Sequence, residues 1–485
     1  MKYIVKYFIF LICFYSHFLA IKGQDTNVVF GSIQEKMPNS KSIDFFQLEK
    51  NCGFIIGDKK TKLPYKFLFF DSSLTLISES EIKFSANAGY VQSIFVNKQI
   101  HFFCSKTNEL GEQELLVQKV GENGLISVPS VLTKYKNNGG YKTAFKVSVS
   151  SDHKKIVVLV EQPFQKDKKE KITLIVFDET LKLQKITTKT LDVMVKHKRK
   201  NFPIIANDGS VYVLKKFYNK KSQFYIYFFN NETKEQAKIS LRNRDVISLM
   251  YTISDEGVLN VFGFFSSPLH ANYEGVFSLR YNKSVHPEFR NEVFLTEKMV
   301  HSFKSKKEIK SKGYGLDNFH LKSIIVDSLN NTFLIAEHFK INNEKNITEH
   351  YRKGLIVVRF NKKGNFVWGE PLLLEQHEKY EKKKNSWSSS IPFIFNNKLN
   401  VIHNSVNYKA KKNDPVLGNT IFNSHWASFD KNGMATKNIM TKINEFSGER
   451  MSLMPKLISQ GENELMLLMQ NENKNKFRLI KISLK

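Results

Sequence analysis

The chain has 485 residues and 41% hydrophobic content, enough to bury a sizeable core in one large repeat domain or in several ordinary ones. Its formal net charge is +28, but nine of the 74 basic residues are arginine and the lysines are spread along the whole chain. Because arginine forks dominate the reading of base edges, we expect no specific nucleic-acid partner. The charge indicates either a solvated basic surface or an anionic partner such as acidic polysaccharide.

The N-terminus predicts a secretory signal peptide. Lys2 and Lys6 precede the apolar run Tyr7–Ala20, and Gly23 then supplies a small residue before a cleavage point. We expect residues 1–23 to be removed and the mature chain to be periplasmic, on the cell surface or secreted. The alternative is an uncleaved anchor, for which the apolar run is short. No later stretch approaches membrane-spanning length, so we expect no transmembrane segment after cleavage.

A polar or Gly/Asn turn that enters a short β-rich run recurs eight times after this segment. The abundance of Phe (41) and Tyr (18) also favours strands. The β-rich runs of the eight copies, in chain order, are Gly53–Ile56, Gln99–Phe103, Ile156–Val160, Val211–Leu214, Val258–Phe262, Thr332–Ala336, Leu399–Ile402 and Glu464–Met469.

A second signature follows most of these runs after a loop. It is an apolar strand that ends in an aromatic residue, then Asp or Asn, then a turn. The copies are Phe70-Asp71, Phe177-Asp178, Phe229-Asn230, Tyr281-Asn282, Phe360-Asn361 and Phe429-Asp430, with Val120–Gly124 as a degenerate copy. Each unit therefore reads as four antiparallel strands joined by hairpin turns.

Four-stranded units of this size predict an all-β fold, a β-propeller of four-stranded antiparallel blades. We expect eight blades, with seven as the second choice, in a single domain spanning residues 24–485. A tandem of β-sandwiches is the structural alternative. The spacing of the units is uneven, and we assign part of the excess to a Lys-rich insertion at Thr296–Gly315 that could hold a short helix. The last unit has three strand runs, so we expect a strand at about residues 27–33 to complete it and close the ring.

The second half of the chain resembles a known group of proteins. The segments Asp317–Val326, Phe333–Glu337, Gly354–Gly364 and Trp368-Gly369 are similar to exported β-propeller repeat proteins of Gram-negative bacteria that have no assigned activity. The resemblance covers about residues 318–485 and the first half only loosely. It implies a binding or surface-associated module and supplies no functional residues.

No catalytic motif is present in the sequence. There is no phosphate-binding glycine loop, no Gly-x-Ser-x-Gly elbow and no His-Glu-x-x-His pair, so we expect no cofactor and no metal. After signal cleavage Cys52 and Cys104 remain. They could form a disulfide, since both lie in strand-like runs of consecutive units, or they could be two buried thiols.

Weak candidates for a ligand site lie where the second strand of several units ends. Glu337 and His338 end one such strand, and the corresponding positions in other units are Glu161, Lys215, Gly263 and His403. A ring of unlike side chains could line the channel mouth, so Glu337, His338, His403 and Glu161 are the candidate ligand-binding residues. The alternative is that each faces solvent at a strand end. Trp387 and Trp426 could stack on sugar rings, or pack between blades.

These observations favour an exported, non-catalytic binding or scaffold module that recognises protein or glycan through loops of one propeller face. The alternative is a carbohydrate-active propeller enzyme, a hydrolase or a lyase, which would need carboxylates that converge on the channel mouth. A third interpretation is a cell-surface subunit bound to an outer-membrane partner.

Overall fold

The computed structural model describes residues 27–483 apart from short gaps. The gaps are residues 32–33, 36–39, 49–50, 59–63, 85–86, 122, 138–141, 164–167, 195–198, 219–221, 231–233, 269–271, 345–346, 382–389, 407–421, 440–450, 461–463 and 472–475. The predicted signal peptide, residues 1–23, and Trp387 lie outside the described residues.

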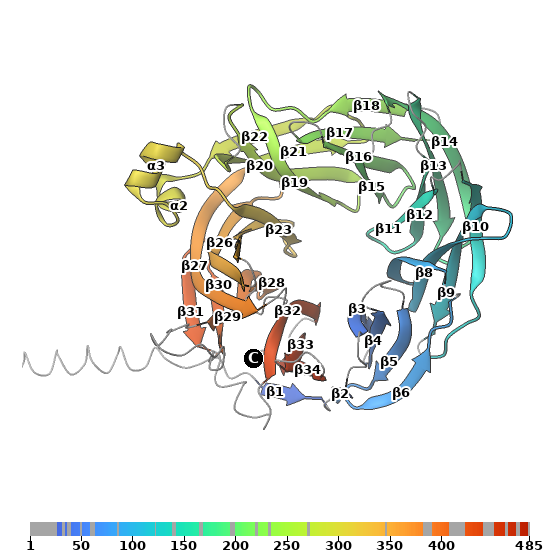
Figure 1. The fold of residues 1–485 in the computed structure, drawn as a ribbon. Helices are drawn as coiled ribbons and strands as arrows, with labels where there is room; N and C mark the ends of the chain where they lie inside the picture. The colour runs from blue at the N-terminus through green and yellow to red at the C-terminus, as the bar shows by residue number, and fades with distance from the viewer. Residues whose placement is uncertain are drawn as a thin grey trace, which may run out of the picture.

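Eight antiparallel sheets stand in a ring, which is the fold of a β-propeller (Figure 1). The strands of the first four blades are β3 (Ser40–Leu48), β4 (Asn51–Asp58), β5 (Pro64–Phe70) and β6 (Leu76–Glu81); β7 (Gly89–Val96), β8 (Gln99–Thr107), β9 (Glu112–Val120) and β10 (Ser130–Lys136); β11 (Ala144–Val149), β12 (Lys155–Glu161), β13 (Lys169–Asp178) and β14 (Leu183–Met194); and β15 (Arg199–Ile205), β16 (Val211–Tyr218), β17 (Ser222–Phe229) and β18 (Lys234–Lys238).

The last four blades follow the same plan with two additions. Their strands are β19 (Asp245–Ile253), β20 (Val258–Ser266), β21 (Gly275–Asn282) and β22 (Phe289–Phe294); β23 (Phe319–Val326), β24 (Thr332–His338), β25 (Lys340–Glu344), β26 (Ile347–Phe360) and β27 (Phe366–Glu381); β28 (Ser390–Phe395), β29 (Lys398–Val406), β30 (Phe422–Phe429) and β31 (Ala435–Ile439); and β32 (Met451–Gln460), β33 (Glu464–Asn471), β34 (Lys476–Ser483), β1 (Asn27–Phe30) and β2 (Gln34–Glu35).

Both turn signatures have the positions that the sequence predicted. The first precedes the second strand of every blade, and the second follows the third strand of blades 1 to 7. Asp430 forms the hydrogen bonds expected of the second signature: its carboxylate accepts from the backbone N–H groups of Asn432 (2.9 Å) and Met434 (2.8 Å). Gly433 has a φ of 86°, a conformation that residues with a Cβ rarely adopt. The propeller prediction is therefore confirmed.

The first and last strands of the described chain pair with each other. β1 lies antiparallel to β34, with Asn27 opposite Ser483 and Phe30 opposite Ile480. The sheet of blade 8 thus has the order β1-β34-β33-β32, and β2 also pairs with β34. This pairing covers the edge of β34 that would otherwise be open to another chain.

The hydrophobic core lies between adjacent blades. The second strand of a blade is covered on both faces by its neighbours, so β12 and β24 read as continuous apolar runs with no alternation. One cluster joins blades 4 and 5 through Tyr212, Phe228 and Phe277, among other residues. Cys52 and Cys104 are buried free thiols, so the disulfide interpretation is wrong.

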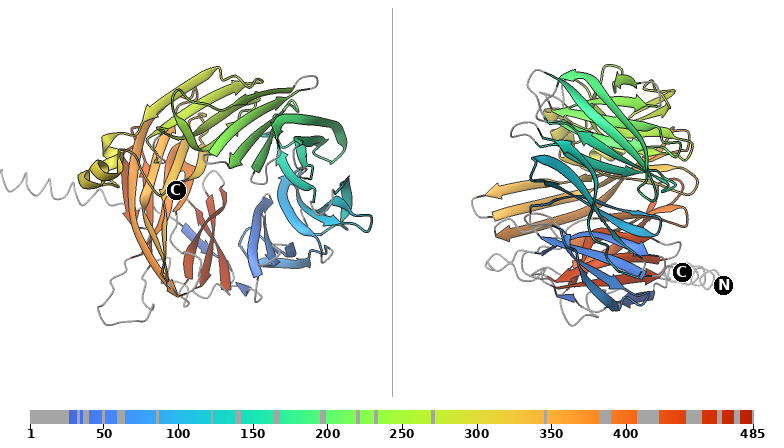
Figure 2. Two further views of the ribbon diagram at one scale, coloured as in Figure 1. Left: turned by 45° about the horizontal axis from the view of Figure 1, so that its top comes forward. Right: turned by 90° about the vertical axis from the view of Figure 1, so that its right-hand side faces the viewer.

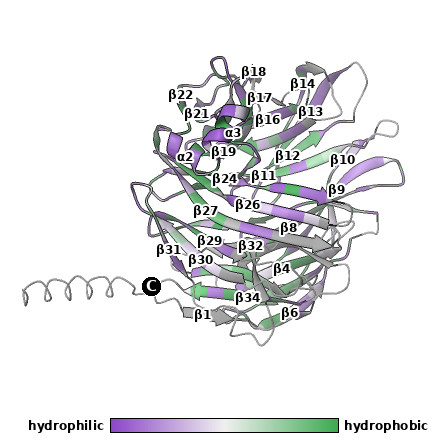
Figure 3. Ribbon diagram, turned by 60° about the vertical axis from the view of Figure 1, so that its left-hand side comes forward, coloured by the Kyte–Doolittle hydropathy of each residue, from purple (hydrophilic) through white to green (hydrophobic). Residues whose placement is uncertain are grey.

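Blade 6 carries the additions that make the repeat uneven. The helices α2 (Glu297–His301) and α3 (Lys306–Lys312) precede it, in the insertion where the sequence suggested a short helix, and α3 is largely hydrophilic (Figure 3). Within the blade, β26 and β27 are long, and β25 pairs with the N-terminal part of β26. The hairpin of β26 and β27 therefore projects past the other blades (Figure 2, right). Among the described residues, neither helix has the length or apolarity needed to cross a bilayer.

Candidate functional site

The candidate residues from the sequence lie on the second strands of five blades, but only some of them at strand ends. Glu161 ends β12, and Glu337 and His338 end β24. Lys215, Gly263 and His403 lie inside β16, β20 and β29, which each continue for three residues, so the prediction that these three end a strand is wrong. Lys215, Glu337, His338 and His403 are buried, and Glu161 is half-buried. The interpretation that each of them faces solvent is therefore wrong for the four buried residues.

Between blades 3 and 4 the candidates belong to a buried polar network. The Lys215 ammonium pairs with Glu170 and donates to Asn201 Oδ1 at 2.8 Å, and the side chains of Lys215 and Glu170 are 0% and 1% exposed. Asn201 Nδ2 donates to both Glu161 (2.8 Å) and Glu170 (2.9 Å). Lys146 completes the network with an ion pair to Glu161 at 3.1 Å. Both carboxylates are thus engaged in contacts that join two blades.

A similar network lies between blades 6 and 7. Glu337 pairs with Lys322 at 3.1 Å and with Arg352 at 3.4 Å, and Ser390 donates to Glu337 at 3.2 Å. Lys322 is the extra residue of a β-bulge in β23, and the bulge directs its side chain toward Glu337. The ion pair of Lys322 with Glu337 thus corresponds to that of Lys146 with Glu161 in the first network. Glu161 and Glu337 therefore occupy separate ion-paired networks rather than one shared cleft.

The two candidate histidines are neutral side chains. Burial lowers the pKa of His338 to about 4, and its Nδ1 accepts a hydrogen bond from the backbone N–H of Lys353 at 3.3 Å. Burial lowers the pKa of His403 to about 3, and its ring stacks on His425 with centroids 5.1 Å apart. Among the described residues neither ring nitrogen of His403 has a hydrogen-bond partner. A role for either histidine in ligand binding stays a prediction.

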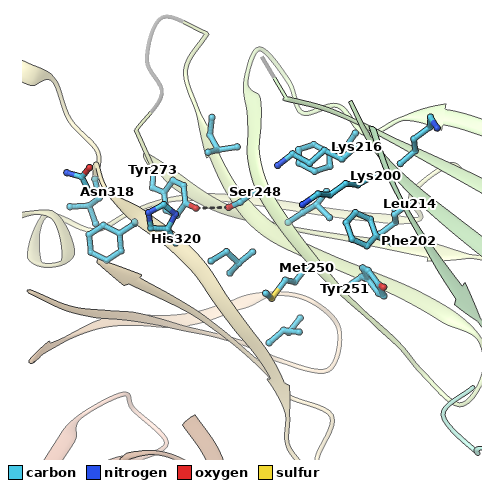
Figure 4. A pocket seen from close by; sticks show the side chains of 18 residues that line it. Lys200, Phe202, Leu214, Lys216, Ser248, Met250, Tyr251, Tyr273, Asn318 and His320 are labelled. Atoms are coloured by element: carbon cyan, nitrogen blue, oxygen red, sulfur yellow. Dashed lines mark hydrogen bonds between the residues drawn. The ribbon is translucent and has the colours of Figure 1, made fainter. Parts of the chain in front are cut away.

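The structure also places a pocket of about 870 Å³ where blades 4, 5 and 6 meet (Figure 4). The first strands of blades 3 and 4, β11 and β15, contact each other, and so do β19 and β23 of blades 5 and 6. β19 also contacts β17 of blade 4. The pocket is lined by Lys200, Phe202, Leu214, Lys215, Lys216, Phe224, Ile247, Ser248, Leu249, Met250, Tyr251, Tyr273, Leu316, Asn318, Phe319, His320, Leu321 and Ile324.

The wall from blade 4 consists of a cationic row beside an apolar row. Lys200 on β15 is directly opposite Lys216 on β16, which is opposite Phe224 on β17. Two residues farther along β15, Phe202 is opposite Leu214. The Lys216 ammonium lies 5.2 Å from the centre of the Phe224 ring, and Phe202 remains 38% exposed. Lys200 and Lys216 therefore place two basic side chains on one face of this sheet, which suits an acidic group of a ligand.

The walls from blades 5 and 6 are mostly apolar. Ser248 donates a hydrogen bond to the Tyr273 hydroxyl at 2.9 Å, and Tyr273 stacks on Phe264 with centroids 4.4 Å apart. Burial raises the pKa of Tyr251 and of Tyr273, so both hydroxyls stay protonated. Asp and Glu do not occur among the lining residues of this pocket.

Sequence reasoning missed this pocket. The basic charge was interpreted as either a solvated surface or the sign of an anionic partner, and neither Lys200 nor Phe202 was singled out. The available signal was the alternation of Lys200 with Phe202 and of Leu214 with Lys216, which places charge and apolar surface on one face. Trp426, by contrast, packs between blades and donates to Asn400 at 2.9 Å, so it does not offer an exposed face to a sugar.

No protein-family model matches the chain, and no curated protein matches it in sequence. Among solved structures it is similar to the WD40 domain of SCAP from fission yeast, at 6% identity and a TM-score of 0.42, over 95% of this chain and 98% of that chain. It is also similar to the β-propeller domain of the Trilobed protease from Pyrococcus furiosus, at 10% identity and a TM-score of 0.40, over 84% and 100%.

A third similar structure is the BP39L lectin from Burkholderia pseudomallei, at 9% identity and a TM-score of 0.39, over 84% of this chain and 98% of that chain. These similarities are too distant to inform on function. The propeller assignment rests on the sheet order of the chain itself, and the resemblance to exported bacterial propeller proteins stays a prediction.

Proposed function

We propose that the protein is a non-catalytic binding module that recognises a negatively charged region of a protein or glycan partner. The observation that carries this proposal is the pocket between blades 4, 5 and 6, which combines lysines, aromatic rings and aliphatic side chains without a carboxylate in its lining. Pockets of this size with a few polar groups on an apolar wall are the usual form of ligand sites.

The same composition weighs against the alternative of a glycoside hydrolase. Hydrolysis by the common mechanism needs two carboxyl groups that flank the scissile bond. The carboxylates that the sequence nominated, Glu161 and Glu337, are ion-paired in separate networks between blades and do not line the pocket. Binding is therefore the function that the geometry supports best.

An array of acidic, neutral and basic oligosaccharides and peptides tests the proposal. The full chain should retain acidic members, the double variant Lys200→Gln/Lys216→Gln should lose them, and the control Lys182→Gln/Lys362→Gln should keep them. The control lysines are exposed and lie outside the pocket. Each double variant replaces two lysines, so both lose the same positive charge. Equal loss in both variants, or cleavage of any retained member, would contradict a pocket-based binding module.

Export is part of the proposal, on the support of the charged, apolar and small-residue order of residues 1–23. Expression of the full chain in its source cell followed by N-terminal sequencing tests it. A first residue at about Gln24 on protein recovered outside the cytoplasm is the expected result, and intact Met1 on cytoplasmic protein is the contrary one.

A further inference from the structure

The lysine, amide and imidazole groups of the pocket lie toward its ends. Lys200 and Lys216 come from blade 4, and Asn318 and His320 come from the start of blade 6, as Figure 4 shows. Between these groups the pocket is lined mainly by the apolar side chains of β19, including Leu249 and Met250. The pocket is therefore charged at one side, polar at the other and apolar along its middle.

This distribution suits a sugar chain poorly. Each sugar ring carries several hydroxyl groups, and each hydroxyl that is buried without a partner costs free energy. Ser248, a polar side chain in the middle of the lining, already bonds Tyr273. The buried ammonium of Lys215 is likewise engaged by Glu170 and Asn201. The middle of the pocket therefore favours a ligand that carries apolar side chains over one that carries hydroxyl groups.

The spacing of the blade 4 wall matches that of an extended peptide. Lys200 and Phe202 are two residues apart on β15, and Lys216 and Leu214 are two residues apart on β16. Alternate residues of a strand lie roughly 6.5–7 Å apart on one face. An extended segment that runs alongside β15 presents its own alternate side chains at the same interval.

The geometry points to a protein segment with the pattern acidic residue, any residue, large apolar residue as the occupant of this pocket. The acidic side chain lies against the Lys200–Lys216 row, and the apolar side chain lies on the exposed ring of Phe202, next to the buried Leu214. This inference rests on the proposed function and narrows it to one partner class. Its basis is the complementarity of charge and of spacing between the two rows and the peptide.

Selection from a library of short random displayed peptides tests the inference, with the immobilised full chain as bait. Peptides that carry Asp or Glu two positions from Phe, Leu, Met or Trp should be enriched over peptides that carry the same residues side by side. The variants Lys200→Gln/Lys216→Gln and Phe202→Ala should lose the enrichment. The variants Lys182→Gln/Lys362→Gln and Phe294→Ala should keep it, because those side chains are exposed outside the pocket.

An enriched peptide is then synthesised with a fluorescent label and titrated by anisotropy. Replacing its acidic residue with the matching amide should weaken binding by about tenfold or more, as loss of a charge-assisted contact does. All variants are first compared with the unmodified chain by circular dichroism and thermal unfolding, so that loss of binding is not loss of fold.

Oligogalacturonate is titrated in parallel as an acidic glycan probe. Pocket-dependent binding of oligogalacturonate with no peptide enrichment would overturn the inference and leave the proposed function standing. Enrichment of peptides without acidic residues, or without the alternate spacing, would also overturn the inference alone. Absence of any binding that depends on Lys200 and Lys216 would overturn both.

Discussion

The buried pair of Lys215 and Glu170 offers a sharp test of how blades 3 and 4 are held together. We expect Glu170→Gln to destabilise the propeller strongly, because it leaves the ammonium of Lys215 buried without its counter-charge. The side chains are 0% and 1% exposed, so water cannot take the place of the lost partner. Breaking a buried ion pair on one side costs about 3–5 kcal/mol, and Lys215→Met should fall in the same range.

The double variant Lys215→Met/Glu170→Gln should be less destabilised than the sum of the two single variants. It removes both charges, and the amide of the new Gln can still accept from Asn201, as Glu170 does at 2.9 Å. We therefore expect an interaction free energy of about 1–3 kcal/mol in the double-mutant cycle.

Urea unfolding measures the cycle, and hydrogen exchange of β15 and β16 gives a local reading that does not require two-state unfolding of so large a chain. Lys134→Met is the matched control, because Lys134 faces Glu112 at 3.7 Å but is 59% exposed, and such surface pairs contribute about 0–1 kcal/mol. Single variants that behave like this control, or a double variant that equals the sum of the singles, would refute the reasoning.

Three further outcomes follow from the structure. Gly263→Ala should destabilise blade 5 by about 2–3 kcal/mol in urea unfolding, because a Cβ there would lie 2.1 Å from the Ser248 carbonyl oxygen; an unchanged midpoint would contradict this. His403 has a folded-state pKa of about 3 against about 6.5 when unfolded, so the unfolded state binds the proton more readily and stability falls as the pH drops from about 6.5 toward 3. His403→Phe should reduce this dependence by up to about 1.4 kcal/mol per pH unit, and an identical pH profile would count against it. Burial raises the pKa of Cys52 and of Cys104 to about 12, so a thiol reagent should label neither in the folded protein and both after unfolding; rapid labelling of the folded chain would show that these sites open.

Local turn chemistry made the fold readable from the sequence. The Asp or Asn after an aromatic strand end, as in Phe429-Asp430, accepts hydrogen bonds from backbone N–H groups within the next four residues. The turn therefore depends only on residues adjacent in the sequence. The same holds for Phe177-Asp178, where the carboxylate accepts from the N–H groups of Thr180 and Lys182. Six copies of this signal and one degenerate copy, together with eight copies of the turn before the second strand, were sufficient to predict eight sheets.

The candidate site was less predictable because it depends on contacts between blades. Glu161 and Glu337 stood at the predicted strand ends, but the sequence did not show that Asn201 and Ser390 of the next blade would bond them. Nor did it show that Lys200 would line a pocket together with residues of β19 and β23, because those strands lie far along the chain.

By itself, the sequence determined the strands, their antiparallel hairpins and their grouping into eight units, because each of these depends on residues close together in the chain. Only the tertiary structure decided which strand ends are buried, which lysines are paired and where the pocket opens. These features arise where residues from different blades meet, and the physical reason is that burial and ion pairing depend on neighbours in space rather than on neighbours in sequence.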